Sequence, residues 1–399
     1  MLRNKNIWIL MSGEMIAGLG MWIGIIGNLE FLQSQVPSDF MKSLILFSGL
    51  FVGVLFGPIA GRVIDQYAKK KIMLYAGGVR ILSVGFMFLA IAQESVMWMI
   101  IYMIGIGLSA AFYFPALQAA IPLIAREGQL LSLNGIHMNV GTIARISGTA
   151  LAGILLVYIS LLAMYLYTFI CYIMIFLCTL ALNIEEPQKN ERKEVKKNVG
   201  FKDVWPIISG TPAIFTGLLL MLVPITFIGS FNMMVLKISE MQNDPAIKGL
   251  LYTTEGISLM IGAFLIKRIS AGKNVILILM TSAFFIAIAH LTLFFADQML
   301  PALLSFALFG FAAGSFFPLA ATLFQTQVSK EFHGRFFSFR NMMDRVLFQV
   351  VLLSTGLFLD TIGFEHMVLS FGGFSLFIVI IMAIRQVKSP VTYIQERSK

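Results

Sequence analysis

Among the ionisable side chains that interrupt the long apolar stretches of this chain, six are the best placed to do chemistry. They are Glu14, Arg145, Glu255, Arg340, Asp344 and Arg345. A charged group at the depth of an apolar span costs about 2.5–3.5 kcal/mol on insertion scales, so such groups are functional candidates by default. Buried carboxyl groups can take up and release protons, and buried cations can change how readily they do so.

Spacing gives each of these groups a more specific expectation. Glu14 should lie about 10 Å into the first apolar span, at a rise of 1.5 Å per residue. Arg340 and Asp344 are four residues apart, so they can pair on one helical face. Glu255 is a second candidate proton carrier, with snorkelling to the interface as its alternative, and Arg345 is a candidate for a central cavity.

Other polar groups in the spans carry weaker signals. Three asparagines, Asn28, Asn139 and Asn232, are candidates for weak substrate contacts. His137 and His290 are expected to be packing histidines more often than proton relays. Arg80 is expected to snorkel or to pair with a neighbour.

The elements that must position these groups are membrane-spanning helices. The 399 residues are 58% hydrophobic and 12% charged, which is too apolar for a soluble globule. Continuous apolar runs, rather than short alternating segments, predict an all-α membrane protein. The expected spans are 7–32, 42–64, 72–92, 97–124, 131–158, 162–183, 212–236, 248–267, 275–296, 301–328, 337–360 and 366–386.

The distribution of basic residues supports this number of spans. With both termini in the cytoplasm, 22 of the 29 Lys and Arg residues fall on the cytoplasmic side. The outer side receives only Lys42, Lys237 and Lys248, as the positive-inside rule predicts. The expected location is therefore the cell (plasma or inner) membrane.

The two halves of the chain resemble each other with an offset of about 200 residues. Phe112-Tyr113-Phe114-Pro115 in the fourth span matches Ser315-Phe316-Phe317-Pro318 in the tenth. A parallel repeat of six plus six spans is typical of transporters. We expect two six-helix bundles, 1–184 and 212–388. Between them lies a linker, 185–211, with an interfacial helix formed from Phe201 to Ile208, and a tail, 389–399, follows.

The loop after the second span carries the most specific motif. It contains Gly61, Asp65, Lys69 and Lys70, and it resembles the signature of the major facilitator superfamily. Gln66 and Ala68 stand where that signature has Arg and Gly. The resemblance implies that Asp65 docks near the start of the eleventh helix as a gate, with Arg340 and Asp344 as gating partners. It also implies that spans one and five line the same cavity, so Glu14 and Arg145 should approach each other.

Within this superfamily the chain is most similar to drug and macrolide efflux proteins and related siderophore exporters. Phe332-His333-Gly334-Arg335 and Ser147-Gly148-Thr149-Ala150 carry this resemblance, although Thr149 replaces an expected Pro. Ile106 stands about where proton-coupled exporters often have Arg. The motif loop is also similar to that of bacterial lysophospholipid transporters.

We therefore expect a secondary transporter that exports small hydrophobic or amphipathic compounds by alternating access, coupled to protons. The alternatives are a lysophospholipid or lipid flippase on the same fold, and a non-transporting membrane sensor or scaffold. The expected partners are a small-molecule substrate, protons and the lipid bilayer, and the expected state is a monomer. The sequence shows no nucleophile–base arrangement, nucleotide-binding loop, metal cluster or nucleic-acid motif, so we expect neither an enzyme nor a cofactor.

Overall fold

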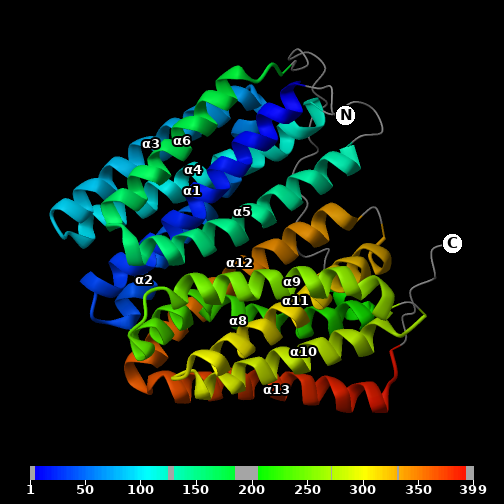
Figure 1. Cartoon of the computed structure of the whole chain (residues 1–399). Helices are drawn as coiled ribbons and strands as arrows, with labels where there is room; N and C mark the ends of the chain where they lie inside the picture. The colour runs from blue at the N-terminus through cyan, green and yellow to red at the C-terminus, as the bar shows by residue number, and fades with distance from the viewer. Residues whose placement is uncertain (1–4, 125–129, 185–204, 271, 330–331, 392–399) are drawn as a thin grey trace. The chain divides into compact units, whose positions relative to one another are not determined.

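A computed structural model describes residues 5–124, 130–184, 205–270, 272–329 and 332–391, and almost all of them lie in helices (Figure 1). The first half of the chain contains α1 (Lys5–Gln35), α2 (Asp39–Gln66), α3 (Lys69–Ala92), α4 (Val96–Ile124), α5 (Leu130–Tyr158) and α6 (Leu161–Ala181). The second half contains α8 (Pro212–Gln242), α9 (Ile247–Ser270), α10 (Val275–Thr292), α11 (Met299–Gln327), α12 (His333–Thr361) and α13 (Gly363–Lys388).

These twelve helices are each long and apolar enough to cross a membrane, and every predicted span is confirmed to within a few residues. The ninth predicted span ends in a short 3₁₀ helix, Leu293–Phe295, after α10. The predicted linker helix is present as α7, Trp205–Gly210, with Pro206 in its first turn, where proline is tolerated. Phe201 and the rest of the linker up to 204 lie outside the described residues.

Local sequence signals set the helix ends. Ser38 and Ser160 accept hydrogen bonds from the first turns of α2 and α6, and Asn274 does the same for α10. Asn243 ends α8 in the left-handed conformation, with φ 50°. Gly363, with φ 79°, makes the turn between α12 and α13, which a residue with a side chain would adopt only with strain.

The chain folds into two compact units. One takes in Met1–Glu194 and Asp244–Thr253, and the other takes in Val195–Asn243 and Thr254–Lys399. The first turns of α9 therefore belong with α1–α6, while the remainder of that helix belongs with the second unit. In the first unit, α4 packs against α2 and α3, and α1 packs against α5 and α6. In the second, α10 packs against α11 and α13, and α8 packs against α12.

Close glycine contacts support the predicted repeat. In the first unit, Gly107 of α4 lies against the backbone of Gly49 in α2. In the second, Gly310 and Gly314 of α11 lie against the backbone of α9 at Glu255 and Leu259. The second and fourth spans of each half thus meet through small residues, which allow close helix approach in membranes.

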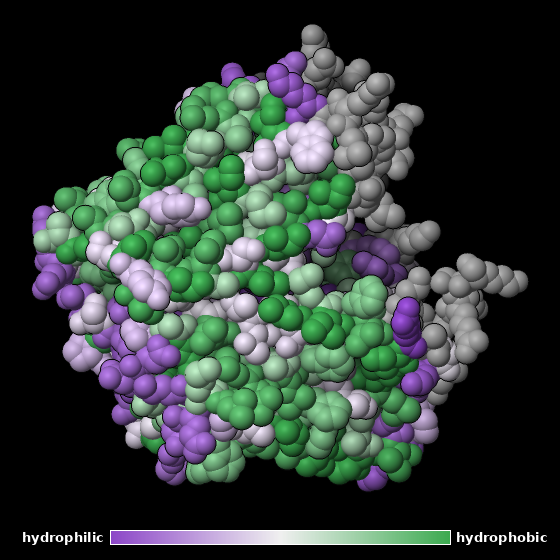
Figure 2. Space-filling model, in the orientation of Figure 1, coloured by the Kyte–Doolittle hydropathy of each residue, from purple (hydrophilic) through white to green (hydrophobic). Residues whose placement is uncertain are grey.

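The outer faces of both units are apolar. Leu166 and Ile170 of α6 and Leu277 and Phe284 of α10 are among many large exposed hydrophobic side chains. In Figure 2, hydrophobic (green) side chains cover the central part of the visible face and hydrophilic (purple) ones lie mainly at its edges. An exposed apolar surface of this extent requires lipid as its solvent, so the chain is a multi-pass membrane protein.

Candidate functional site

The first unit contains a small pocket of about 120 Å³ beside Glu14, lined by both apolar and ionisable side chains. Its lining comes from α1 (Glu14, Ala17, Gly18, Met21, Trp22), α3 (Arg80), α4 (Phe114) and α5 (His137, Gly141). Gly18 lies against Ala144, and Gly148 lies against the backbone of Leu19, so small residues hold α1 and α5 close together. The result is a cavity that combines an acid, a guanidinium group, an imidazole and two aromatic rings.

Glu14 is the acid at the centre of this pocket. The Tyr113 hydroxyl donates a hydrogen bond of 2.7 Å to Oε1 of Glu14. Nε2 of His137 lies 4.0 Å from Oε2, and the Glu14 side chain is only 12% exposed. Three helices therefore converge on one carboxyl group, which α1 supplies and α4 and α5 contact.

Arg80 also lines the pocket, and it does not snorkel, because it is only 7% exposed. Its Nε donates to the Ser109 hydroxyl at 3.3 Å. Its guanidinium carbon lies 4.5 Å from the ring centroid of Tyr113 and 5.2 Å from that of Tyr172. A guanidinium over aromatic faces gains about 0.5–2 kcal/mol by cation–π attraction. Arg80 therefore orients the same tyrosine that binds Glu14.

Arg145 lies near this pocket through a different contact. Its guanidinium carbon is 5.9 Å from the ring centroid of Trp22, which lines the cavity. The contacts that the structure gives Glu14 are with Tyr113 and His137, so the expected approach of Glu14 and Arg145 stays a prediction. Trp22 therefore connects Arg145 of α5 with the lining of the pocket.

Trp22 also contacts the beginning of α9. Its ring and that of Tyr252 meet edge to face, with centroids 6.0 Å apart. One turn earlier in α9, the Nζ of Lys248 is 2.9 Å from Oε2 of Glu30, and Lys248 is 0% exposed. The first turns of α9 are therefore fastened to α1 by an ion pair and packed against the pocket wall.

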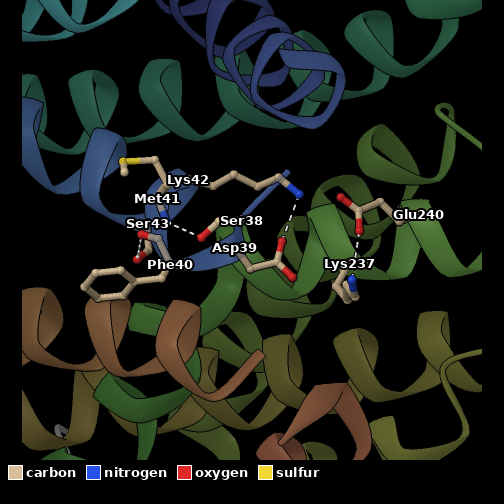
Figure 3. Close-up of polar contacts among 8 residues, drawn as sticks. All are labelled: Ser38, Asp39, Phe40, Met41, Lys42, Ser43, Lys237 and Glu240. Atoms are coloured by element: carbon tan, nitrogen blue, oxygen red, sulfur yellow. Dashed lines mark hydrogen bonds and ion pairs between the residues drawn. The ribbon is translucent and has the colours of Figure 1, made fainter. Parts of the chain in front are cut away.

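The three lysines assigned to the outer side are all paired with acids. Besides Lys248 with Glu30, Lys42 pairs with Asp39 at 2.8 Å and Lys237 pairs with Glu240 at 3.0 Å. Figure 3 shows these two pairs, each formed within its own helix. Each of the few basic residues predicted outside is thus paired with a nearby acid, while the side of the membrane on which they lie stays a prediction.

The three asparagines differ in their surroundings. Asn28 is buried and accepts a hydrogen bond from the Tyr165 hydroxyl, so its amide oxygen is engaged inside the bundle. Asn139 is exposed and Asn232 is half-buried. Among the described residues, none of the three lines the Glu14 pocket.

In the second unit the predicted pairing of Arg340 with Asp344 is present, with Nε and Oδ2 3.5 Å apart. Arg340 also lies over the ring of Phe324, 4.9 Å from its centroid. Glu255 is buried and Arg345 is exposed. Their roles in a cavity or a gate stay predictions.

The motif loop has one clear structural contact. Gly61 and Asp65 lie in the last turns of α2, and α3 begins at Lys69. The Nζ of Lys70 donates to the carbonyls of Leu180 and Leu182 at 2.8 and 2.6 Å, so it binds the carbonyl end of α6. The side chain of Asp65 lies outside the described residues, so its predicted docking stays a prediction.

The sequence points to Glu14 but not to its partners. In the sequence Tyr113 is only one of many aromatic residues, while Arg80 is expected to snorkel or pair with a neighbour and His137 is expected to pack. The sequence does contain one signal for Tyr113, which is a difference between the two repeats: Tyr113 has a hydroxyl group, whereas its counterpart in the second half, Phe316, has none. In the part of the chain that the structure describes, no group of His, Cys, Asp and Glu could hold a metal ion.

Within the described residues, twelve apolar helices in two compact units define a polytopic all-α membrane protein. A family model described as Major Facilitator Superfamily matches residues 10–347. The chain belongs to the Major Facilitator Superfamily, and it is a transporter of that family.

Two curated relatives and one solved structure illustrate the similarity. Macrolide efflux protein A of Streptococcus pyogenes is 23% identical over 396 residues, covering 95% of each chain. The lysophospholipid transporter LplT of Citrobacter koseri is 26% identical over 155 residues, which cover 38% of this chain and 36% of LplT. The crystal structure of the nucleoside transporter NupG superposes with a TM-score of 0.74 at 13% identity, covering 95% of this chain and 98% of NupG.

Proposed function

We propose that this protein exports small hydrophobic or amphipathic compounds across the plasma membrane in exchange for protons. The single observation that carries the proposal is the partly buried carboxyl group of Glu14, which lies in a pocket with aromatic walls and accepts a hydrogen bond from Tyr113. A carboxyl in such a place can hold a proton in one state of the cycle and release it in another. The full-length similarity to a protein described as a macrolide efflux protein supports the direction and the substrate class.

The pocket contains groups suited to binding a hydrophobic substrate and groups suited to binding a proton. Trp22 and Phe114 offer apolar faces to a hydrophobic substrate, while Glu14 and His137 offer polar atoms. Arg80 holds Tyr113, so movement of either would change the hydrogen bonding of Glu14. We propose that Glu14 carries the proton and that substrate and proton compete for this pocket as the two units alternate access. Both termini would lie in the cytoplasm, and the protein would act as a monomer.

Gating would use the residues at the cytoplasmic ends of α2, α3 and α12. Asp65 and the basic residues of its loop would form one side of the gate, and Arg340 and Asp344 the other. The observed attachment of Lys70 to α6 supports a rigid base for this loop. Arg145, Glu255 and Arg345 would face the central path.

The experiment starts with a panel of antibiotics, dyes and siderophores applied to a deletion strain, because the substrate must first be identified. The compound with the greatest gain in toxicity is then tested in inverted vesicles containing the full-length protein. We expect uptake that follows an imposed pH gradient and stops when the gradient is collapsed. Uptake that persists without the gradient would contradict proton exchange.

A lipid flippase is the second candidate function, and the similarity to LplT over 155 residues is the observation that favours it. It predicts transfer of a headgroup-labelled lysophospholipid between leaflets of proteoliposomes. Transfer at the rate of protein-free vesicles, together with drug uptake, would separate the two functions in favour of efflux.

A further inference from the structure

The first unit has a second cavity, which shares no lining residue with the Glu14 pocket. It is a groove of about 380 Å³ among α2, α3 and α4. Its walls include Ile59 and Val63 of α2, Tyr75 and Val79 of α3, and Leu108 and Phe112 of α4. The groove exists because α2 and α3 each pack against α4, which leaves a furrow between them.

The groove is suited to a hydrocarbon chain. Its one hydroxyl-bearing aliphatic residue, Ser109, already donates to the Ala76 carbonyl at 2.7 Å, so that polar group is satisfied within the protein. Along α2, Ile59 lines the groove and is 47% exposed, so the groove is open on this side of the helix. Tyr75, at the edge of the groove, is 78% exposed.

One end of the groove carries positive charge. The wall of the groove on α2 includes Ile59 and Val63. Helical residues three or four apart share a face, so Arg62, three residues after Ile59, lies on this side of α2 near its end. In the same way, the wall at Tyr75 continues back to Lys71 at the start of α3. Arg62 and Lys71 are both exposed. The segment 62–71 has four basic residues and one acidic residue, a net charge of +3.

An apolar groove that ends at cations matches one kind of molecule, a lipid with an anionic headgroup. Basic residues near a membrane surface attract such lipids by about 1 kcal/mol each. We propose that this groove binds one acyl chain of an anionic phospholipid whose phosphate group lies against Arg62 and Lys71. The site is distinct from the Glu14 pocket, and it does not depend on the identity of the transported substrate.

The test measures lipid binding by the purified full-length protein, by native mass spectrometry, with phosphatidylglycerol and phosphatidylcholine of identical acyl chains. We expect selective retention of phosphatidylglycerol. Arg62→Gln and Lys71→Gln should each weaken that binding about fivefold. Lys273→Gln, which removes an exposed charge from the turn before α10, is the control and should change nothing. Equal retention of the two lipids would overturn the headgroup assignment.

The acyl chain is tested separately. Val79→Phe should fill the groove and reduce the binding of phosphatidylglycerol, whereas Leu166→Phe on the exposed face of α6 should not. Val79→Leu is a milder version in case Val79→Phe fails to fold, and it should show a smaller reduction in the same direction. Unchanged binding by a folded Val79 variant would overturn the groove assignment.

Two further arms identify the source of the ligand. A photoactivatable phosphatidylglycerol, with the reactive group in its acyl chain, should label peptides of α2, α3 or α4, and labelling only elsewhere would overturn the proposal. Glycerol phosphate at high concentration should not displace the lipid, and displacement would indicate a site for free anions. Because these measurements need no substrate, their failure would leave the transport proposal unaffected.

Discussion

The two halves of this transporter share a repeated sequence pattern but have interiors of different chemistry. In the first unit, Glu14, Tyr113, Arg80 and His137 meet around one pocket. In the second unit, Phe227 stacks on Phe309 with ring centroids 3.8 Å apart and also contacts Phe306 and Phe231. One unit has a cluster of ionisable and hydroxyl groups around Glu14, and the other has a cluster of phenylalanines, so our proposal places the proton carrier in the first unit.

A single pair of matched residues shows this divergence. Tyr113 and Phe316 occupy the same place in the repeated motif before the prolines of α4 and α11. Both are almost fully buried, but only Tyr113 has a hydroxyl, and that hydroxyl binds Glu14. One oxygen atom thus distinguishes the polar unit from the apolar one at this position.

The largest effect is expected from Glu14→Gln. The amide keeps the shape of the side chain but cannot carry a proton, so transport driven by a pH gradient should fall about 100-fold, as for loss of a charged hydrogen-bonding group worth about 2–3 kcal/mol. Vesicle uptake is the measurement. Glu94→Gln, in the exposed turn between α3 and α4, is the matched control. Full activity of Glu14→Gln would assign the proton to another residue.

A smaller effect is expected from Arg80→Lys. Lysine keeps the charge but loses the planar group that lies over Tyr113, so transport should fall about tenfold at an unchanged expression level. Arg385→Lys is the control in the second unit, where Arg385 lies 4.7 Å from the ring centroid of Phe215. Equal effects at the two sites would mean that these contacts serve general stability rather than the pocket.

Exchanging the matched pair tests the comparison itself. Tyr113→Phe removes one hydrogen bond and should lower transport about fivefold, since such a bond contributes about 1 kcal/mol. Phe316→Tyr adds a hydroxyl to a fully buried site, so it should lower thermal stability by about 1 kcal/mol or more and leave the coupling to protons intact. Transport that responds to Phe316→Tyr and not to Tyr113→Phe would reverse the assignment of roles.

The smallest effect is expected at His290. This residue is 0% exposed, and neither ring nitrogen has a hydrogen-bond partner among the described residues. Its ring lies among phenylalanines, 4.9 Å from Phe227 and 5.9 Å from Phe371 between centroids. His290→Leu removes an unsatisfied polar group and should raise stability by about 1 kcal/mol without changing transport. A loss of proton coupling in this variant would show that the second unit also carries protons.

Most of the fold could be predicted from sequence because a lipid environment leaves few choices. Apolar runs of the right length must be helices, so the twelve predicted spans agree closely with the structure. Their direction across the membrane, which the basic loops indicate, stays a prediction. The repeat was visible in the proline motifs. The membership of 244–253 in the first unit was not visible, because it depends on the buried pairing of Lys248 with a residue 218 positions earlier.

The site was only partly predictable for a related reason. Glu14 is conspicuous as an acid in an apolar span, but its partners depend on which faces of α1, α3, α4 and α5 meet. Hydropathy cannot give these faces when helices are apolar on all sides. Arg80 illustrates the difficulty, because an arginine at this depth can either snorkel to the interface or stack on an aromatic ring. Arg80 stacks because Ser109 and Tyr113 lie within reach of its guanidinium group, and the sequence alone does not give their positions.

The most direct test of the central role of Glu14 is the release of protons when substrate binds. Purified full-length protein in weakly buffered detergent solution is mixed with the compound identified by the susceptibility panel, and the pH is followed with a soluble indicator. Competition for the pocket predicts a prompt acidification with the natural sequence and none with Glu14→Gln. Equal acidification by both proteins would contradict the account.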